Sequence, residues 1–124
     1  MPFVEITGKV KNGRSLSRGI GFPTINIAVP KTVNQNNFGI WFSLVTIDGK
    51  IYPGVTHLGQ PKTFKIKHPT CETYLLNLNQ DLYGRTVKKK LILKFRDIID
   101  FPDVKALRRE IQNDVKEAKK FFGI

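Results

Sequence analysis

The chain has 124 residues, of which 40% are hydrophobic and 25% charged, a composition that indicates one globular domain with a single modest core. No run approaches the roughly 18 apolar residues of a membrane span, and the first residues alternate like a strand instead of forming a signal peptide. We therefore expect a cytoplasmic protein without membrane partners. The single cysteine, Cys71, excludes an internal disulfide, and no Cys or His cluster has zinc-ligand spacing.

The formal net charge of +11 has three interpretations. Lys and Arg side chains can neutralise the phosphates of a nucleic acid, attract a small anion such as a nucleotide, or simply cover a solvated surface. The charge is spread from Lys9 to Lys120, and no nucleic-acid-binding motif accompanies it. A solvated basic surface, with nucleotide attraction as a by-product, is the favoured interpretation, and a nucleic-acid partner is not expected.

The first three quarters of the chain predict six β-strands. In the first strand Val4, Ile6 and Val10 alternate with polar residues, which indicates one buried face. Two later β-rich runs are joined by Asp48-Gly49, a dipeptide that favours a two-residue hairpin turn because it tolerates positive φ. The expected strands cover residues 1–10, 24–29, 40–47, 50–58, 72–78 and 86–99.

Alternation also assigns faces in the last strand, which follows a predicted turn at residues 81–84. Leu91, Leu93 and Phe95 are spaced two apart, so we expect them to share one face.

The period of the apolar residues changes after Pro102. Asp103 is a suitable N-cap, because its carboxylate can accept a free backbone N–H and complements the helix dipole. The amphipathic stripe that follows consists of Val104, Leu107, Ile111, Val115, Ala118 and Phe122. The fold class is therefore mostly β: a six-stranded, antiparallel, Greek-key-like closed barrel with one long C-terminal α-helix packed against it. Residues 1–124 form a single domain.

The most informative stretch runs from Gly19 to Asn26 and reads Gly-Ile-Gly-Phe-Pro-Thr-Ile-Asn. It does not fit a dinucleotide-binding fingerprint, because Thr24 replaces the third glycine, and a Walker A loop and protein-kinase signature are absent from the chain. Thr24 and Asn26 are two apart on a predicted strand, so their oxygens point to one side and could bind Mg²⁺. From the spacing alone, an ordinary strand start after a turn is the favoured interpretation.

A series of motifs follows in order along nearly the whole chain. They are Gly13-Arg14, the stretch 19–26, Gly39-Ile40-Trp41, Tyr52-x-Gly54-Val55, Gly59, the run 72–76, the run 81–84, Arg96, Phe101, Leu107, Ile111, Asp114 and Ala118-Lys119. Together they resemble the riboflavin kinase (flavokinase) family of the ATP-dependent type. The resemblance implies a stand-alone kinase domain that makes FMN and ADP from riboflavin and Mg-ATP.

The resemblance also implies roles for individual residues. Thr24 and Asn26 would hold Mg²⁺, Glu72 would be the catalytic carboxylate that takes the proton of the ribityl hydroxyl, and Arg96 and Phe101 would lie on the flavin side. Nucleotide binding is implied for Gly13, Arg14, Gly19, Gly21, Pro23, Thr24 and Asn26.

Glu72 has a separate argument in the pattern of its strand. It opens an apolar strand in a chain with only ten acidic residues, and alternation places it with Tyr74, Leu76 and Leu78. If that face is the barrel interior, the carboxylate lies partly desolvated at the barrel mouth, as suits a catalytic base. Without the resemblance, a strand-end glutamate that reaches solvent is the favoured interpretation.

Two departures from the family leave the flavin contacts open. Residues 56–63 replace a segment that in many bacterial relatives carries Asn and Pro-Thr, and residues 74–78 replace the common His-Leu-Leu-Asp-Phe. Bacterial relatives are also often fused to an adenylyltransferase that makes FAD, so this chain is either a single-function enzyme or one half of such a protein.

Two alternative functions stay open from the sequence. The first is a flavin- or nucleotide-binding module without catalysis, and the second is a basic RNA-binding barrel. We expect the protein to be a monomer.

Overall fold

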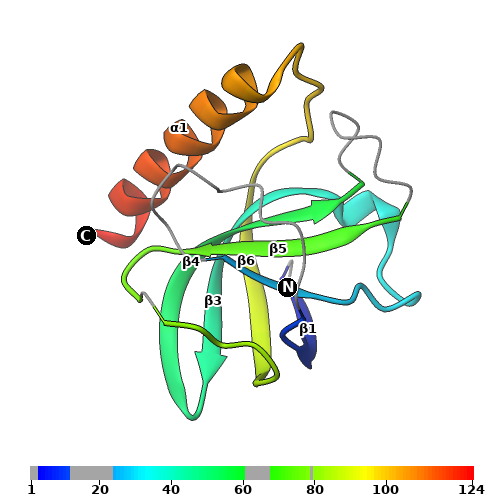
Figure 1. Ribbon diagram of the computed structural model, residues 1–124, viewed down its shortest axis with the longest axis vertical. Helices are drawn as coiled ribbons and strands as arrows, with labels where there is room; N and C mark the ends of the chain where they lie inside the picture. Colours follow the sequence, from blue (N-terminus) through cyan, green and yellow to red (C-terminus); the bar gives the residue numbers. More distant parts are fainter. Residues whose placement is uncertain (1–2, 12–23, 61–67, 79) are drawn as a thin grey trace.

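The computed structural model describes residues 3–11, 24–60, 68–78 and 80–124, which form one antiparallel sheet and a C-terminal helix (Figure 1). The elements are β1 (Val4–Lys9), β2 (Thr24–Ile27), the 3₁₀ helix η1 (Gln35–Asn37), β3 (Gly39–Ile47), β4 (Lys50–Gly59), β5 (Thr70–Leu75), β6 (Thr86–Arg96) and α1 (Val104–Phe122). All six predicted strands are present, and most are shorter than the sequence pattern indicates. No helix in these described ranges is long and apolar enough to cross a membrane.

The six strands lie in the order β1-β6-β3-β4-β5-β2. Within it β3, β4 and β5 form a meander and β6 returns to the side of β3, which is Greek-key order as predicted. The sheet curls until its two edge strands approach each other: a Cβ added at Gly8 of β1 would lie 3.3 Å from Ile27 Cβ of β2.

The prediction of a closed barrel is wrong. Between the two edges the described residues form a single isolated bridge, in which Lys11 N donates to Asn26 O at 2.9 Å. Among the described residues, the four residues of β2 form a ladder with β5 alone. The result is a curled half-barrel.

The β3–β4 turn confirms the hairpin prediction at Asp48-Gly49. Both residues have positive φ, 50° and 79°, as a primed two-residue turn requires. The Arg85 guanidinium forms an ion pair with the Asp48 carboxylate at the surface beside this turn.

Strand β6 departs from simple alternation. Its pairing with β3 has two register shifts, and each inserted residue reverses the face that the following side chains occupy. Leu91 consequently lies in the core inside the half-barrel, Phe95 packs in the cluster under the helix, and Leu93 is 43% exposed. The prediction that these three share one face is wrong.

The described residues form two apolar clusters, one on each face of the sheet. The first fills the half-barrel, and the second lies between the outer face of β3–β4–β5 and helix α1. Figure 1 shows α1 lying along one side of the sheet. The predicted N-cap is confirmed, since Asp103 Oδ1 accepts from Ala106 N at 2.8 Å. Four members of the predicted stripe are buried in the second cluster, namely Leu107, Ile111, Val115 and Ala118.

Candidate active site

The candidate site is built on the pair of strands β2 and β5. In their register Thr24 lies opposite Tyr74, and Asn26 lies opposite Glu72. Because residues directly opposite each other in an antiparallel pair point to the same face, these four side chains share one face. It is the face that α1 covers, since Tyr74 belongs to the cluster under the helix and Ile25 to the core inside the half-barrel.

Glu72 is buried, with 2% of its surface exposed, so a strand-end glutamate reaching solvent does not describe it. It does not point into the half-barrel either. Leu76 shares its face as predicted, whereas Leu78 lies beyond the end of β5 and packs against the interior core. The carboxylate lies on the helix-covered face, because the apolar alternation of β5 directs Cys71 and Leu75, not Glu72, to the interior.

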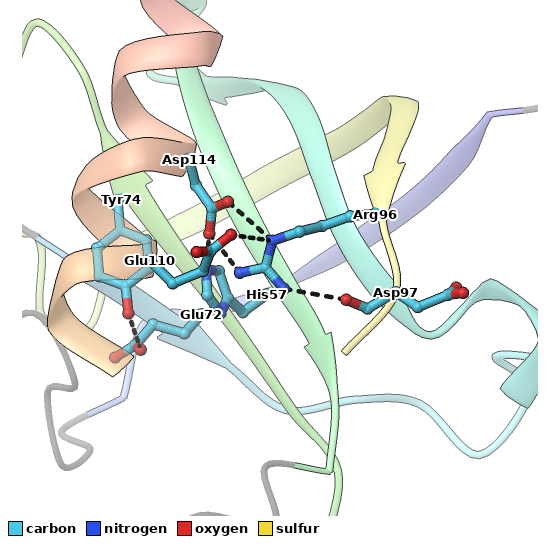
Figure 2. A network of polar contacts seen from close by, with 7 residues as sticks. All are labelled: His57, Glu72, Tyr74, Arg96, Asp97, Glu110 and Asp114. Atoms are coloured by element: carbon cyan, nitrogen blue, oxygen red, sulfur yellow. Dashed lines mark hydrogen bonds and ion pairs between the residues drawn. The ribbon is translucent and has the colours of Figure 1, made fainter. Parts of the chain in front are cut away.

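Tyr74 orients the Glu72 carboxylate. Its hydroxyl donates a hydrogen bond to Glu72 Oε1 at 3.0 Å, as Figure 2 shows. Burial, and then the negative charge of Glu72, hold the pKa of Tyr74 well above its usual range. The phenol therefore stays protonated near neutral pH and acts as a donor to the carboxylate.

Asn26 presents an oxygen that the fold does not satisfy. Its Oδ1 is buried and lacks a hydrogen-bond partner in the described part of the chain, a costly arrangement for an amide oxygen. Thr24 lies two residues away on the same half-buried edge strand. An amide oxygen and a hydroxyl are hard oxygen ligands, so this corner fits a divalent cation such as Mg²⁺.

This corner does not resemble a metal cage. Across residues 3–11, 24–60, 68–78 and 80–124, no three His, Cys, Asp or Glu side chains are grouped so that they could hold a metal. Mg²⁺ commonly binds through one or two protein ligands together with substrate phosphates and water. The sparse set of oxygens at Asn26 is compatible with that mode of binding.

A charged network beside the site ties α1 to the sheet (Figure 2). Arg96 of β6 binds Asp114 of α1 through two hydrogen bonds, Nε to Oδ1 at 2.9 Å and Nη2 to Oδ2 at 2.6 Å. Glu110 Oε1 lies 3.5 Å from Arg96 Nε. His57 Nε2 of β4 lies 3.6 Å from Asp114 Oδ2, slightly beyond hydrogen-bond distance, and its ring packs edge-on against Tyr74.

Asp114 is fully buried in this network. Burial raises the pKa of its carboxyl, but the nearby His57 ring and the hydrogen bonds and charge of Arg96 outweigh that effect and hold the pKa below its usual range. The carboxylate therefore stays ionised at neutral pH, and helix α1 is fixed behind the Tyr74–Glu72 pair.

The structure brings together only part of the predicted site. Thr24, Asn26 and Glu72 converge on one face, as described above. Arg96 and Phe101 lie beside α1, where the Arg96 guanidinium binds helix carboxylates and Phe101 packs half-buried in the cluster under the helix. Their flavin contact stays a prediction. The predicted nucleotide contacts at Gly13, Arg14, Gly19, Gly21 and Pro23 lie outside the described residues.

Three residues of this site, Tyr74, Asp114 and His57, were not predicted from the sequence as site residues. Tyr74 was placed on the face of Glu72 but without its hydrogen bond. Asp114 carries a recognisable signal, since a carboxylate between Ile111 and Val115 in the apolar stripe indicates a buried basic partner. His57 has no comparable signal, because its contact with the helix depends on how the sheet curls.

The comparisons with known protein sequences agree on one family. The family "Flavokinase: Riboflavin kinase" matches residues 2–122. A Haemophilus influenzae bifunctional riboflavin kinase/FMN adenylyltransferase is 36% identical over 120 residues, a match that covers 96% of this chain and 39% of that protein. The chain thus spans about two fifths of the length of this relative.

Two solved structures are similar in fold. A riboflavin kinase from Trypanosoma brucei has a TM-score of 0.64 and 27% identity, with 98% of this chain and 80% of that chain covered. A Streptococcus pneumoniae structure described as a macrolide-efflux protein has a TM-score of 0.76 and 26% identity, with 93% of this chain and 38% of that chain covered.

Proposed function

The chain belongs to the flavokinase family of riboflavin kinases, and from this premise we propose that it transfers the γ-phosphate of ATP to the ribityl 5′-hydroxyl of riboflavin, giving FMN and ADP. The observation that carries the proposal is the pairing of Asn26 with Glu72. An unsatisfied buried amide oxygen and a buried, oriented carboxylate face the same way from opposite positions on two strands. Phosphoryl transfer to an alcohol needs both a cation-binding corner and a proton acceptor.

Thr24 and Asn26 are the residues that would hold Mg²⁺, through the hydroxyl and the amide oxygen. When bound, Mg²⁺ would neutralise the charge on the ATP phosphates. The residues proposed to bind the nucleotide around it are Gly13, Arg14, Gly19, Gly21 and Pro23, on the strength of the family motif alone.

Glu72 is the proposed general base. As the 5′-oxygen of riboflavin bonds to the γ-phosphorus, the bond from that phosphorus to the β–γ bridging oxygen breaks and ADP leaves. The hydroxyl proton passes to the Glu72 carboxylate. Tyr74 holds Oε1 of this carboxylate by its hydrogen bond, so the base is oriented before the substrate arrives.

Helix α1 and the segment from Arg96 to Phe101 are proposed to form the flavin side. Arg96 would act there chiefly through the helix, because its guanidinium is already engaged by Asp114 and Glu110. We propose a monomer and a cytoplasmic location.

Turnover tests the proposal directly. The protein is incubated with riboflavin and Mg-ATP, and FMN is separated by chromatography. FMN that forms in proportion to enzyme, and only when ATP is present, supports the proposed activity. Retained flavin binding without FMN would instead indicate a binding module without catalysis. Production of FAD would show an additional adenylyltransferase activity.

A further inference from the structure

Lys89 of β6 is a lysine inside the apolar half-barrel. None of its surface is exposed, and it lies between the inward-facing core residues Val87 and Leu91. Its ammonium crosses the interior to the opposite wall, where Nζ donates to Ile25 O and to Cys71 O, each at 2.9 Å.

These two carbonyls belong to the two strands of the candidate site. Ile25 stands between Thr24 and Asn26 on β2, and Cys71 immediately precedes Glu72 on β5. The Lys89 ammonium therefore joins β2 to β5 from the inner face, directly behind the position where Asn26 and Glu72 lie opposite each other on the outer face.

Strand β2 depends on such a link more than the other strands do. It has four residues, stands at the edge of the sheet, and pairs along its length only with β5. The described residues give it one backbone bridge on the other side, at Lys11. Short edge strands fray readily, so two hydrogen bonds from a charged donor are a large part of what holds β2 in register.

Fold stability alone does not explain a lysine at this position. Burial lowers the pKa of Lys89 from its usual value, and interactions with Cys71 and Glu72 oppose this effect only in part. A buried ammonium carries a desolvation cost that an apolar side chain of similar volume does not. A methionine would fill the same space without the desolvation cost, and what it would lack is the pair of directional hydrogen bonds.

We propose that Lys89 is a positioning residue, which fixes the spacing between β2 and β5 and so holds the Asn26 amide oxygen opposite the Glu72 carboxylate. The inference rests on the proposed function for its chemical consequence: the cation-binding corner and the base are held in register from behind. The Lys89 ammonium lies on the inner face of the two strands, whereas the Asn26 and Glu72 side chains lie on the outer face.

The test compares Lys89→Met with a matched core variant, Val87→Ala. Val87 is an inward-facing neighbour on the same strand, and its truncation weakens the core without removing a hydrogen bond to β2 or β5. Backbone amide exchange is measured by NMR in the ligand-free protein, with the amides of β3 and β4 as an internal reference.

In Lys89→Met we expect exchange at residues 24–27 to rise by about tenfold or more relative to β3 and β4, for the loss of two hydrogen bonds from a charged donor. Val87→Ala should raise exchange evenly across the sheet. Equal acceleration of β2 and β3 in Lys89→Met would overturn the proposal. If Lys89→Met does not fold, Lys89→Gln, whose side chain is uncharged and ends one bond short of the Nζ position, is measured in the same way and judged by the same ratio.

A second measurement connects the positioning to the chemistry. In Lys89→Met the Mg²⁺ concentration for half-maximal FMN formation should rise several-fold, while KM for riboflavin changes little and Val87→Ala leaves both unchanged. An unchanged Mg²⁺ requirement would overturn the link to the metal corner. If the wild-type protein forms no FMN, the proposed function fails, but the exchange ratio still decides whether Lys89 holds β2 in register.

Discussion

Asp114→Asn tests whether the buried network fixes helix α1. The substitution keeps the shape of the side chain but removes its negative charge. The carboxylate accepts two hydrogen bonds from Arg96 and lies near the His57 ring. Removing one partner of a buried ion pair costs up to about 3–5 kcal/mol, and because Glu110 still contacts Arg96 we expect the lower end, about 3 kcal/mol. For a domain of this length, with an unfolding entropy of about 2 cal/mol/K per residue, that loss corresponds to a fall in Tm of roughly 12 °C.

The pH dependence gives the same network a second signature. The pKa of Asp114 is lower in the folded protein than in the unfolded chain. The Asp114 carboxylate therefore contributes fully to the free energy of unfolding at pH values above its unfolded pKa of about 4. This contribution is lost as the pH falls through the lower pKa that Asp114 has in the folded protein. The wild-type protein should therefore lose this stability in the acid range, and Asp114→Asn should lack that component.

Thermal unfolding followed by circular dichroism, at pH 7 and in steps down to about pH 3, measures both effects. Asp97→Asn is the matched control: Asp97 pairs with Lys94 at the surface and its side chain is 85% exposed, so its Tm should stay close to that of the wild type. A Tm for Asp114→Asn within about 2 °C of wild type, with an unchanged acid limb, would refute the reasoning.

Two further predictions concern the site, and a third concerns the basic surface. Tyr74→Phe should lower kcat for FMN formation by about tenfold with little change in the KM for ATP, because Glu72 loses its orienting hydrogen bond; an unchanged kcat would contradict that role. Thr24→Ala and Asn26→Ala should each raise the Mg²⁺ concentration for half-maximal rate with the fold intact by circular dichroism, whereas lower activity at an unchanged Mg²⁺ requirement would make the pair structural. Binding to random RNA, followed by fluorescence anisotropy, should be weak, with Kd of about 10⁻⁴ to 10⁻⁶ M at physiological salt; tight, salt-resistant binding would support an RNA-binding barrel.

Local patterns predicted most of the secondary structure. The hairpin at Asp48-Gly49 and the helix after Asp103 are both local signals, since one depends on positive φ at two adjacent residues and the other on a cap followed by an apolar stripe. Both were found where the sequence indicated. The bulges of β6 have no such signal, because they arise where β6 adapts to β3, so the face of Leu93 was predicted wrongly.

Closure of the barrel and the make-up of the site depend on contacts between distant segments. Whether the sheet closes is decided by how far the short strand β2 extends beside β1, which apolar alternation does not report. Alternation did place Thr24 with Asn26, and separately Glu72 with Tyr74. The register that sets Asn26 opposite Glu72 is a property of the folded sheet.

The central claim is that Glu72 takes the proton of the riboflavin hydroxyl as the phosphoryl group is transferred. The most direct test is a single-turnover measurement of FMN formation by wild-type protein and Glu72→Gln, with enzyme in excess over riboflavin and Mg-ATP saturating. Single turnover is needed because slow product release would hide a change in the chemical step. We predict that the wild type forms FMN and that Glu72→Gln binds riboflavin but forms FMN more slowly by about 10²- to 10⁴-fold. Equal single-turnover rates would remove Glu72 from the mechanism, and absence of FMN with the wild type would contradict the proposed function itself.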